Sequence, residues 1–229
     1  MPTLPRIPRN ARSHGRRANG RARSLIHLVS HPLLEEHLAY LRSRTTRREN
    51  FKWRLKEAAK ILLLEALKSA PLKTISVATP LKTTQAKTLA CPISFVAILR
   101  AGLGLTGGML ELLPTAPIGH IGIFRDEKTL QPVLYYTKLP KTTPDSLIVL
   151  ADPMLATGGS ASEAIDIIKS SGCKKIILVT LVCARKGIEA LRKAHPDVPI
   201  YTAAIDPVLN ANGYIVPGLG DCGDRLFGT

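Results

Sequence analysis

The length, composition and charge of the chain exclude several classes of protein. With 229 residues, 45% of them hydrophobic and only 4% aromatic, the sequence suits one sizeable aliphatic α/β domain and not a disordered chain. No apolar run approaches the roughly 18 residues that a membrane helix needs, so we expect a soluble, cytoplasmic protein with no membrane partner. The four cysteines contain no CxxC pair, which indicates reduced thiols and not a zinc site.

The formal net charge of +15 is concentrated at the N-terminus. Within residues 1–23 there is no acidic residue, and the arginines there are Arg6, Arg9, Arg12, Arg16, Arg17, Arg21 and Arg23. We expect residues 1–24 to form a basic, flexible tail and residues 25–229 to form a single domain. An Arg-rich organellar transit segment and an arm for nucleic acid are alternatives that this composition leaves open.

Two helices and an extended arm are predicted next along the chain. Apolar residues at helical spacing predict helices over residues 33–42 and 49–70, the second of which Pro71 ends. Residues 74–84 alternate between apolar and polar side chains around Pro80. This pattern predicts an extended arm or hairpin, because proline is disfavoured inside a central strand.

From residue 92 onward, apolar strands alternate with helices. Strands are predicted over residues 93–99, 118–124, 146–150, 175–182 and 200–204, with a hairpin-like return over residues 133–136. Helices are predicted over residues 102–113, 160–170 and 187–195. Such alternation implies a mostly parallel, twisted sheet flanked by helices, in which ligands bind beyond the carboxyl ends of the strands.

The turn that begins at Asp152 has the composition of an anion-binding loop. Asp152 follows a buried strand, where a carboxylate can accept hydrogen bonds from the hydroxyls of a sugar. Two glycines then lead into a helix, whose first N–H groups and positive dipole end attract phosphate. The hydroxyls of Thr157, Ser160 and Ser162 are further donors. The alternative is an ordinary turn in which one hydroxyl caps the helix; a Walker loop is excluded because no lysine follows the glycines.

The string DPMLATGGS resembles the 5-phosphoribosyl-1-pyrophosphate (PRPP) loop of the type I phosphoribosyltransferases, in the form found in the uracil phosphoribosyltransferase family. The resemblance implies that PRPP binds to Asp152, Pro153, Met154, Leu155, Ala156, Thr157, Gly158, Gly159 and Ser160. Most of the superfamily has two adjacent acids at this strand end. Ala151 stands at the first of them here, a departure that the uracil branch tolerates.

A second loop, ILRAGLG, follows the strand that ends near residue 99. Arg100 is suited to bidentate contact with a pyrophosphate, and the glycines leave room for backbone donors. The same glycines match the dinucleotide fingerprint GxGxxG, with Asp126 as the possible ribose acid, but that match is weak alone. The loop is similar to the pyrophosphate loop of the uracil enzymes, which also accounts for Arg100.

The turn at Arg125 supplies a third candidate. A lone arginine in a turn is usually solvated, but the resemblance implies that Arg125 also reaches the pyrophosphate. Catalytic roles are thereby assigned to Arg100, Arg125, Asp152 and Asp221.

The C-terminal run NGYIVPGLGDCGDRLFGT combines five glycines with apolar anchors, which indicates a shaped loop and not a frayed end. It resembles the uracil-binding hood of the family, which implies base contacts at Ile215, Gly220, Asp221 and Cys222. Asp221 would also approach PRPP or its magnesium. The family usually has alanine where Cys222 stands, which is harmless if that position acts through its backbone N–H.

The resemblance implies conversion of uracil and PRPP to uridine monophosphate and pyrophosphate in pyrimidine salvage. It implies Mg²⁺ as the cofactor, carried by the substrate and not by direct protein ligands. It also implies a homo-oligomer, with the arm as a candidate interface, and a GTP activator near the N-terminal helices. The alternative function is an RNA-binding regulatory protein on the same fold, although nucleic acid is not the partner that we expect.

Overall fold

The computed structural model describes residues 25–125 and 132–229, so the predicted tail and Asp126 lie outside the described residues. Two helices begin this part of the chain after a short strand: β1 (Ile26–Leu28), α1 (Pro32–Arg42) and α2 (Arg48–Leu67). Both helices were predicted, although α2 ends three residues before the predicted end at residue 70. His31 caps α1, where its Nδ1 accepts a hydrogen bond from Leu33 N over 3.2 Å.

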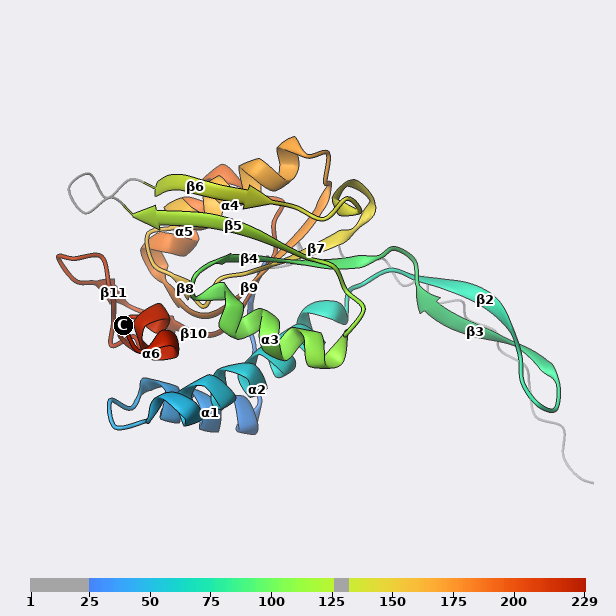
Figure 1. Ribbon diagram of the computed structural model, residues 1–229, viewed down its shortest axis with the longest axis horizontal. Helices are drawn as coiled ribbons and strands as arrows, with labels where there is room; N and C mark the ends of the chain where they lie inside the picture. Colours follow the sequence, from blue (N-terminus) through green and yellow to red (C-terminus); the bar gives the residue numbers. More distant parts are fainter. Residues whose placement is uncertain (1–24, 126–131) are drawn as a thin grey trace, which may run out of the picture.

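The predicted arm is a β-hairpin that stands away from the rest of the structure (Figure 1). Its strands, β2 (Leu72–Ala78) and β3 (Thr83–Leu89), pair in antiparallel register. Leu81 at its tip is 97% exposed, and Ile75 is 38% exposed.

An eight-stranded, mostly parallel sheet forms the centre of the molecule, as predicted. Its strand order is β1-β10-β9-β7-β4-β5-β6, with β8 beside β9, and only the β5–β6 pair is antiparallel. Its strands after β1 are β4 (Ile93–Leu99), β5 (Ile118–Arg125), β6 (Pro132–Lys138), β7 (Leu147–Ala151), β8 (Met154–Leu155), β9 (Lys175–Ala184) and β10 (Ile200–Asp206). The sequence pattern did not predict β1 or β8, each of which has three residues or fewer.

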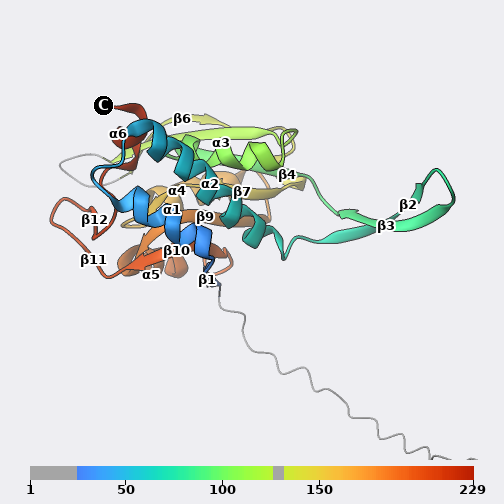
Figure 2. The ribbon, with the colours of Figure 1, turned by 90° about the horizontal axis from the view of Figure 1, so that it is seen from below.

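Helices cover both faces of the sheet (Figures 1 and 2). One apolar cluster joins α2 and α3 (Gly102–Leu112) to side chains such as Phe95 and Val149. The other joins α4 (Gly159–Ser170) and α5 (Arg185–Ala194) to side chains such as Ile148 and Leu150. The division follows from the strand geometry, because successive side chains point to opposite faces of a sheet.

The remaining elements are short and lie in loops. A 3₁₀ turn, η1 (Thr143–Asp145), precedes β7. Near the C-terminus, β11 (Val208–Leu209) pairs with β12 (Ile215–Val216), and α6 (Cys222–Phe227) follows. In the described part of the chain, no helix has both the length and the apolar character of a membrane span.

Candidate active site

The predicted site residues gather at one edge of the sheet. Arg100 and Asp152 directly follow the carboxyl ends of β4 and β7, which are neighbouring parallel strands. Arg125 is the last residue of β5, the neighbour of β4 on the other side, but its side chain is not described. Since the carboxyl ends of parallel strands lie at the same edge, these loops open toward a common space.

The phosphate loop turns sharply into α4. Gly158 immediately precedes the helix with φ at 88°, in the left-handed region that favours glycine. A Cβ at Gly158 would lie 2.9 Å from the carbonyl oxygen of Gly187, so the first turn of α5 packs closely against this turn. The N-cap residue of α4 is Gly158, and within the described residues the N-cap forms no side-chain hydrogen bond to the helix. The ordinary turn, with a Thr or Ser as the N-cap, is therefore wrong, and the first N–H groups of the helix follow a glycine.

Ser162 departs from the prediction. Its hydroxyl lies 3.0 Å from Nε2 of His195, a histidine that is only 4% exposed. Lys169 Nζ lies 3.3 Å from the other ring nitrogen of His195. We therefore remove Ser162 from the predicted phosphate donors, because its hydroxyl is used to join α4 to the end of α5.

Asp152 is half-buried at the start of the loop. Its Oδ1 accepts a long hydrogen bond of 3.5 Å from Met154 N, and its own N–H donates to Val179 O. Pro153 and Leu155 are buried, and the carbonyl of Pro153 accepts hydrogen bonds from β9. These two side chains thus hold the loop against the sheet.

Arg100 connects the second loop to the C-terminal helix. It donates from Nη2 to Asp224 Oδ1 over 2.9 Å and from Nη1 to Thr229 Oγ1 over 3.3 Å. The side chain is 52% exposed. The guanidinium therefore remains accessible to an anion at the edge of the sheet.

The C-terminal hood, which we define as residues 212–229, closes over the same edge. Asp221 caps α6, where its Oδ1 accepts a hydrogen bond from Asp224 N over 2.8 Å. Ile215 and Cys222 are buried, whereas Gly220 is exposed with φ at 78°. The short helix α6 was not predicted, because its six residues carry too little periodicity for a helical pattern.

Asp152 and the hood lie close enough to interact electrostatically. Burial raises the pKa of the Cys222 thiol well above its usual range, and the negative charges of Asp152 and Asp221 raise this pKa further. The phosphate loop and the predicted base-binding residues thus converge, although they are about seventy positions apart in the sequence.

The arrangement of acids is compatible with a substrate-borne cation. In residues 25–125 and 132–229, no group of three or more His, Cys, Asp or Glu side chains forms a protein cage for a metal. Asp152 and Asp221 nevertheless converge at the edge where PRPP is predicted to bind. Mg²⁺ commonly uses one or two carboxylates together with the phosphates of a substrate, so these residues fit that ion.

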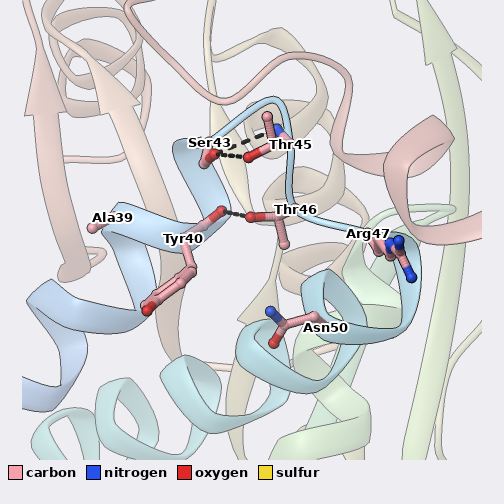
Figure 3. A pocket seen from close by; sticks show the side chains of 7 residues that line it. All are labelled: Ala39, Tyr40, Ser43, Thr45, Thr46, Arg47 and Asn50. Carbon is pink, nitrogen blue, oxygen red and sulfur yellow. Dashed lines mark hydrogen bonds between the residues drawn. The ribbon is translucent and has the colours of Figure 1, made fainter.

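A separate pocket of about 440 Å³ lies on α1, α2 and the loop between them (Figure 3). Hydrogen bonds stabilise this loop. Thr46 Oγ1 donates to the carbonyl of Tyr40 over 2.5 Å, and the hydroxyls of Ser43 and Thr45 form a hydrogen bond of 2.9 Å with each other. Arg47 lies at the rim of the pocket. None of the predicted substrate-binding residues lines it.

Several contacts near the site were not predicted. Arg42 and Arg225 bind the hood backbone, and Asp224 binds Arg100. The contact of Gly187 with the phosphate loop could have been predicted. A glycine in the first turn of a predicted helix suggests that another backbone segment lies close to it. The arginines offered no such signal, because Gly218 lies 176 positions from Arg42 and nothing local marks the Leu219 carbonyl as a partner of Arg225.

The parallel sheet, the phosphate loop after β7, the arginine loop after β4 and the hood over them define a type I phosphoribosyltransferase. A family model described as uracil phosphoribosyltransferase matches residues 28–229. The chain therefore belongs to the uracil phosphoribosyltransferase family. This membership removes the dinucleotide interpretation of the glycines after Arg100.

Individual relatives agree with this assignment. A uracil phosphoribosyltransferase of Clostridium perfringens (strain SM101 / Type A) is 49% identical over 202 residues, which cover 88% of this chain and 97% of that protein. One of Dictyoglomus turgidum is 50% identical over 206 residues, which cover 90% of this chain and 100% of that protein. The solved structure of the AQ2163 protein from Aquifex aeolicus is 37% identical, with a TM-score of 0.84 over 88% of this chain and 97% of that chain.

Proposed function

We propose that residues 25–229 act as a single domain that transfers the phosphoribosyl group of PRPP to N1 of uracil, with release of pyrophosphate. The observation that carries this proposal is the contact between the loop after β4 and the hood at the edge of the sheet, where Arg100 Nη2 lies 2.9 Å from Asp224 Oδ1. The negative charges of Asp152 and Asp221 both act on the Cys222 thiol in the hood. A ribose phosphate on the α4 turn would place its anomeric carbon toward the hood. The relatives that bear the name uracil phosphoribosyltransferase support uracil as the base.

The chemistry requires positioning and charge stabilisation more than covalent catalysis. Breaking the anomeric C–O bond leaves positive charge on the ribose and negative charge on the departing pyrophosphate. Arg100 would stabilise the leaving group, and Arg125 would do so from the adjacent strand. Asp152 would hold the ribose hydroxyls, while the turn from Thr157 to Ser160 would hold the 5′-phosphate. Fixed geometry of this kind lowers the entropic part of the barrier.

Magnesium would supply further neutralisation of the pyrophosphate when bound with PRPP. The carboxylates of Asp152 and Asp221 would hold it through the substrate. Among the described histidines, His195 is bound to Ser162, His31 caps α1 and His37 lies beside Arg54, so we assign the proton at uracil N1 to none of these three. We assign its removal to Asp221 or solvent.

The test is product formation from uracil and PRPP in the presence of magnesium, with cytosine and hypoxanthine as competing bases. Uridine monophosphate from uracil alone supports the proposal. Folded protein that makes no nucleotide from any base would contradict it. The RNA-binding alternative gains no support from the relatives, and its basic arm lies outside the described residues.

We propose that the β2–β3 hairpin joins copies of the chain into a homo-oligomer. Exposed apolar side chains along an extended hairpin, including Leu72, Ile75 and Leu81, favour burial against a partner. Sedimentation of the wild type and a Leu72→Asp/Ile75→Asp variant tests this assignment. A variant that sediments as a smaller species supports it, and an unchanged mass contradicts it.

We assign the GTP activator to the pocket between α1 and α2, where Arg47 offers a cation to a phosphate. Titration of turnover with GTP, for the wild type and for Arg47→Gln, tests this assignment. Activation that requires Arg47 supports it, whereas rates that do not respond to GTP contradict it.

A further inference from the structure

Two arginines outside the predicted site bind consecutive carbonyl groups of the hood. Arg42, at the end of α1, donates from Nη1 to Gly218 O over 2.8 Å. Arg225, in α6, donates from Nη1 to Leu219 O over 2.8 Å. The next residues along the chain are Gly220, Asp221 and Cys222, which are three of the four residues to which we assign uracil contacts; the fourth, Ile215, lies just before Gly218. The backbone is therefore held immediately before the segment that would bind the base.

Arg42 is itself held by an acid from the central sheet. It forms a two-pronged contact with Asp206, with distances of 2.7 Å and 2.8 Å to the two carboxylate oxygens. Gly218 N donates to the same carboxylate over 2.8 Å, so both backbone polar groups of Gly218 are bound within this cluster. Asp206 is 5% exposed. Planar, charge-assisted contacts of this kind fix direction as well as distance.

Arg225 ties the hood to the loop between α1 and α2. Besides Leu219, its guanidinium donates to the carbonyls of Leu41 and Ser43, the latter over 2.6 Å. The same group lies 4.2 Å from the ring centroid of Phe51 in α2. The Arg225 side chain thus donates hydrogen bonds to three carbonyl groups, one in the hood and two at the end of α1 and the loop after it. The single ammonium group of a lysine cannot reproduce this geometry.

We infer that Arg42 and Arg225 are positioning residues for uracil, which hold the Gly218–Leu219 backbone so that the base-binding turn after it has the correct geometry. The inference rests on the proposed uracil site in the hood. Neither guanidinium needs to touch substrate. Their loss would mainly weaken binding of the base, because PRPP is held by the separate loops after β4 and β7.

The experiment compares Arg42→Gln, Arg225→Met and Arg225→Lys with the wild type. The control is Arg44→Gln, which removes an exposed charge two residues from Arg42. We expect the KM for uracil to rise about tenfold in the Gln and Met variants, with the KM for PRPP changed by less than about twofold and kcat retained at saturating uracil. Arg225→Lys should recover part of the affinity for uracil, and Arg44→Gln should match the wild type.

Thermal unfolding of each variant shows whether it folds. If Arg42→Gln does not fold, the pair Arg42→Gln/Asp206→Asn replaces it, because removal of both charges leaves no unpaired buried carboxylate. Folded variants with an unchanged KM for uracil would overturn the inference. Equal increases in both KM values would also overturn it, since they indicate general damage.

A further variant separates failure of the inference from failure of the proposed uracil site. Cys222→Val enlarges a buried side chain at the predicted base contact. If this variant raises the KM for uracil while the arginine variants do not, the site stands and the positioning role is wrong. If none of these variants alters the KM for uracil, the assignment of the hood as the uracil site is wrong as well.

Discussion

Arg100 Nη2 lies 2.9 Å from Asp224 Oδ1, so an arginine predicted to bind pyrophosphate is paired with an acid of the C-terminal helix. Both side chains are about half exposed, and an ion pair of this kind adds little to stability. The pair instead places a negative charge where the leaving group would bind. We therefore expect Asp224 and pyrophosphate to compete for the same guanidinium.

The competition predicts a specific effect of Asp224→Asn. Removal of the negative charge should tighten inhibition by the product pyrophosphate by about threefold to tenfold, because about 1 kcal/mol of repulsion disappears. The inhibition constant of pyrophosphate is the measurement. Asp145→Asn removes an exposed acid elsewhere and should leave that constant unchanged. Weaker inhibition in Asp224→Asn would show that Asp224 orients Arg100 and does not compete with its ligand.

The turn at Gly158 predicts a contrast between two adjacent glycines. Gly158→Ala should destabilise the fold by about 1–2 kcal/mol, because alanine disfavours its positive φ and its Cβ would meet the carbonyl of Gly187. Gly159→Ala is the matched control, since the nearest atom to its Cβ would lie 3.6 Å away. Urea unfolding of both variants measures the difference. Equal stabilities would show that the turn relaxes around the added methyl group.

The sequence predicted the elements with strong periodicity and the motifs with unusual composition. Helices α1 to α5 and the strands of the sheet other than β1 and β8 produce apolar patterns, and the loops at Arg100 and Asp152 follow such strands directly. The class of fold and the place of the phosphate loop could therefore be predicted. The glycines of the hood were enough to locate it in the sequence. Its contact with Arg42 at the end of α1 could not be predicted.

The remaining features depend on contacts between distant segments. Arg42 and Asp206 are 164 positions apart, and nothing local in either segment marks them as partners. Ser162 resembles a phosphate donor in sequence, but folding brings His195 within 3.0 Å of its hydroxyl. Side-chain partners of this kind are set by the tertiary structure, which overrides the local pattern.

The state of Cys222 predicts tolerance to alanine. Because burial and the nearby acids raise the pKa of its thiol, Cys222 stays neutral throughout the neutral range. Cys222→Ala should therefore leave the pH profile of kcat/KM unchanged and reduce stability by only about 1 kcal/mol for the lost sulfur. The KM for uracil should change by less than about threefold, if the backbone N–H provides the contact. A larger increase would assign the contact to the thiol side chain.

The Arg42–Asp206 pair predicts how stability depends on pH. Burial by itself would raise the pKa of Asp206, but hydrogen bonds from Arg42 and Gly218 N outweigh it, and the pKa is lowered overall. A carboxyl group with a lowered folded-state pKa adds stability above its unfolded value of about 3.9, and this contribution is lost as the pH falls through the folded value.

Because of this group, wild-type protein should lose melting temperature mainly as the pH falls below about 4, and not between pH 7 and about 5. Asp206→Asn should be less stable than the wild type at pH 7 and should lose less of its melting temperature over the acidic range. Asp145→Asn, an exposed control, should follow the wild type at every pH. If Asp206→Asn and the wild type show parallel curves, the charge of Asp206 does not stabilise the fold. Arg42 would then hold Gly218 without help from its carboxylate partner.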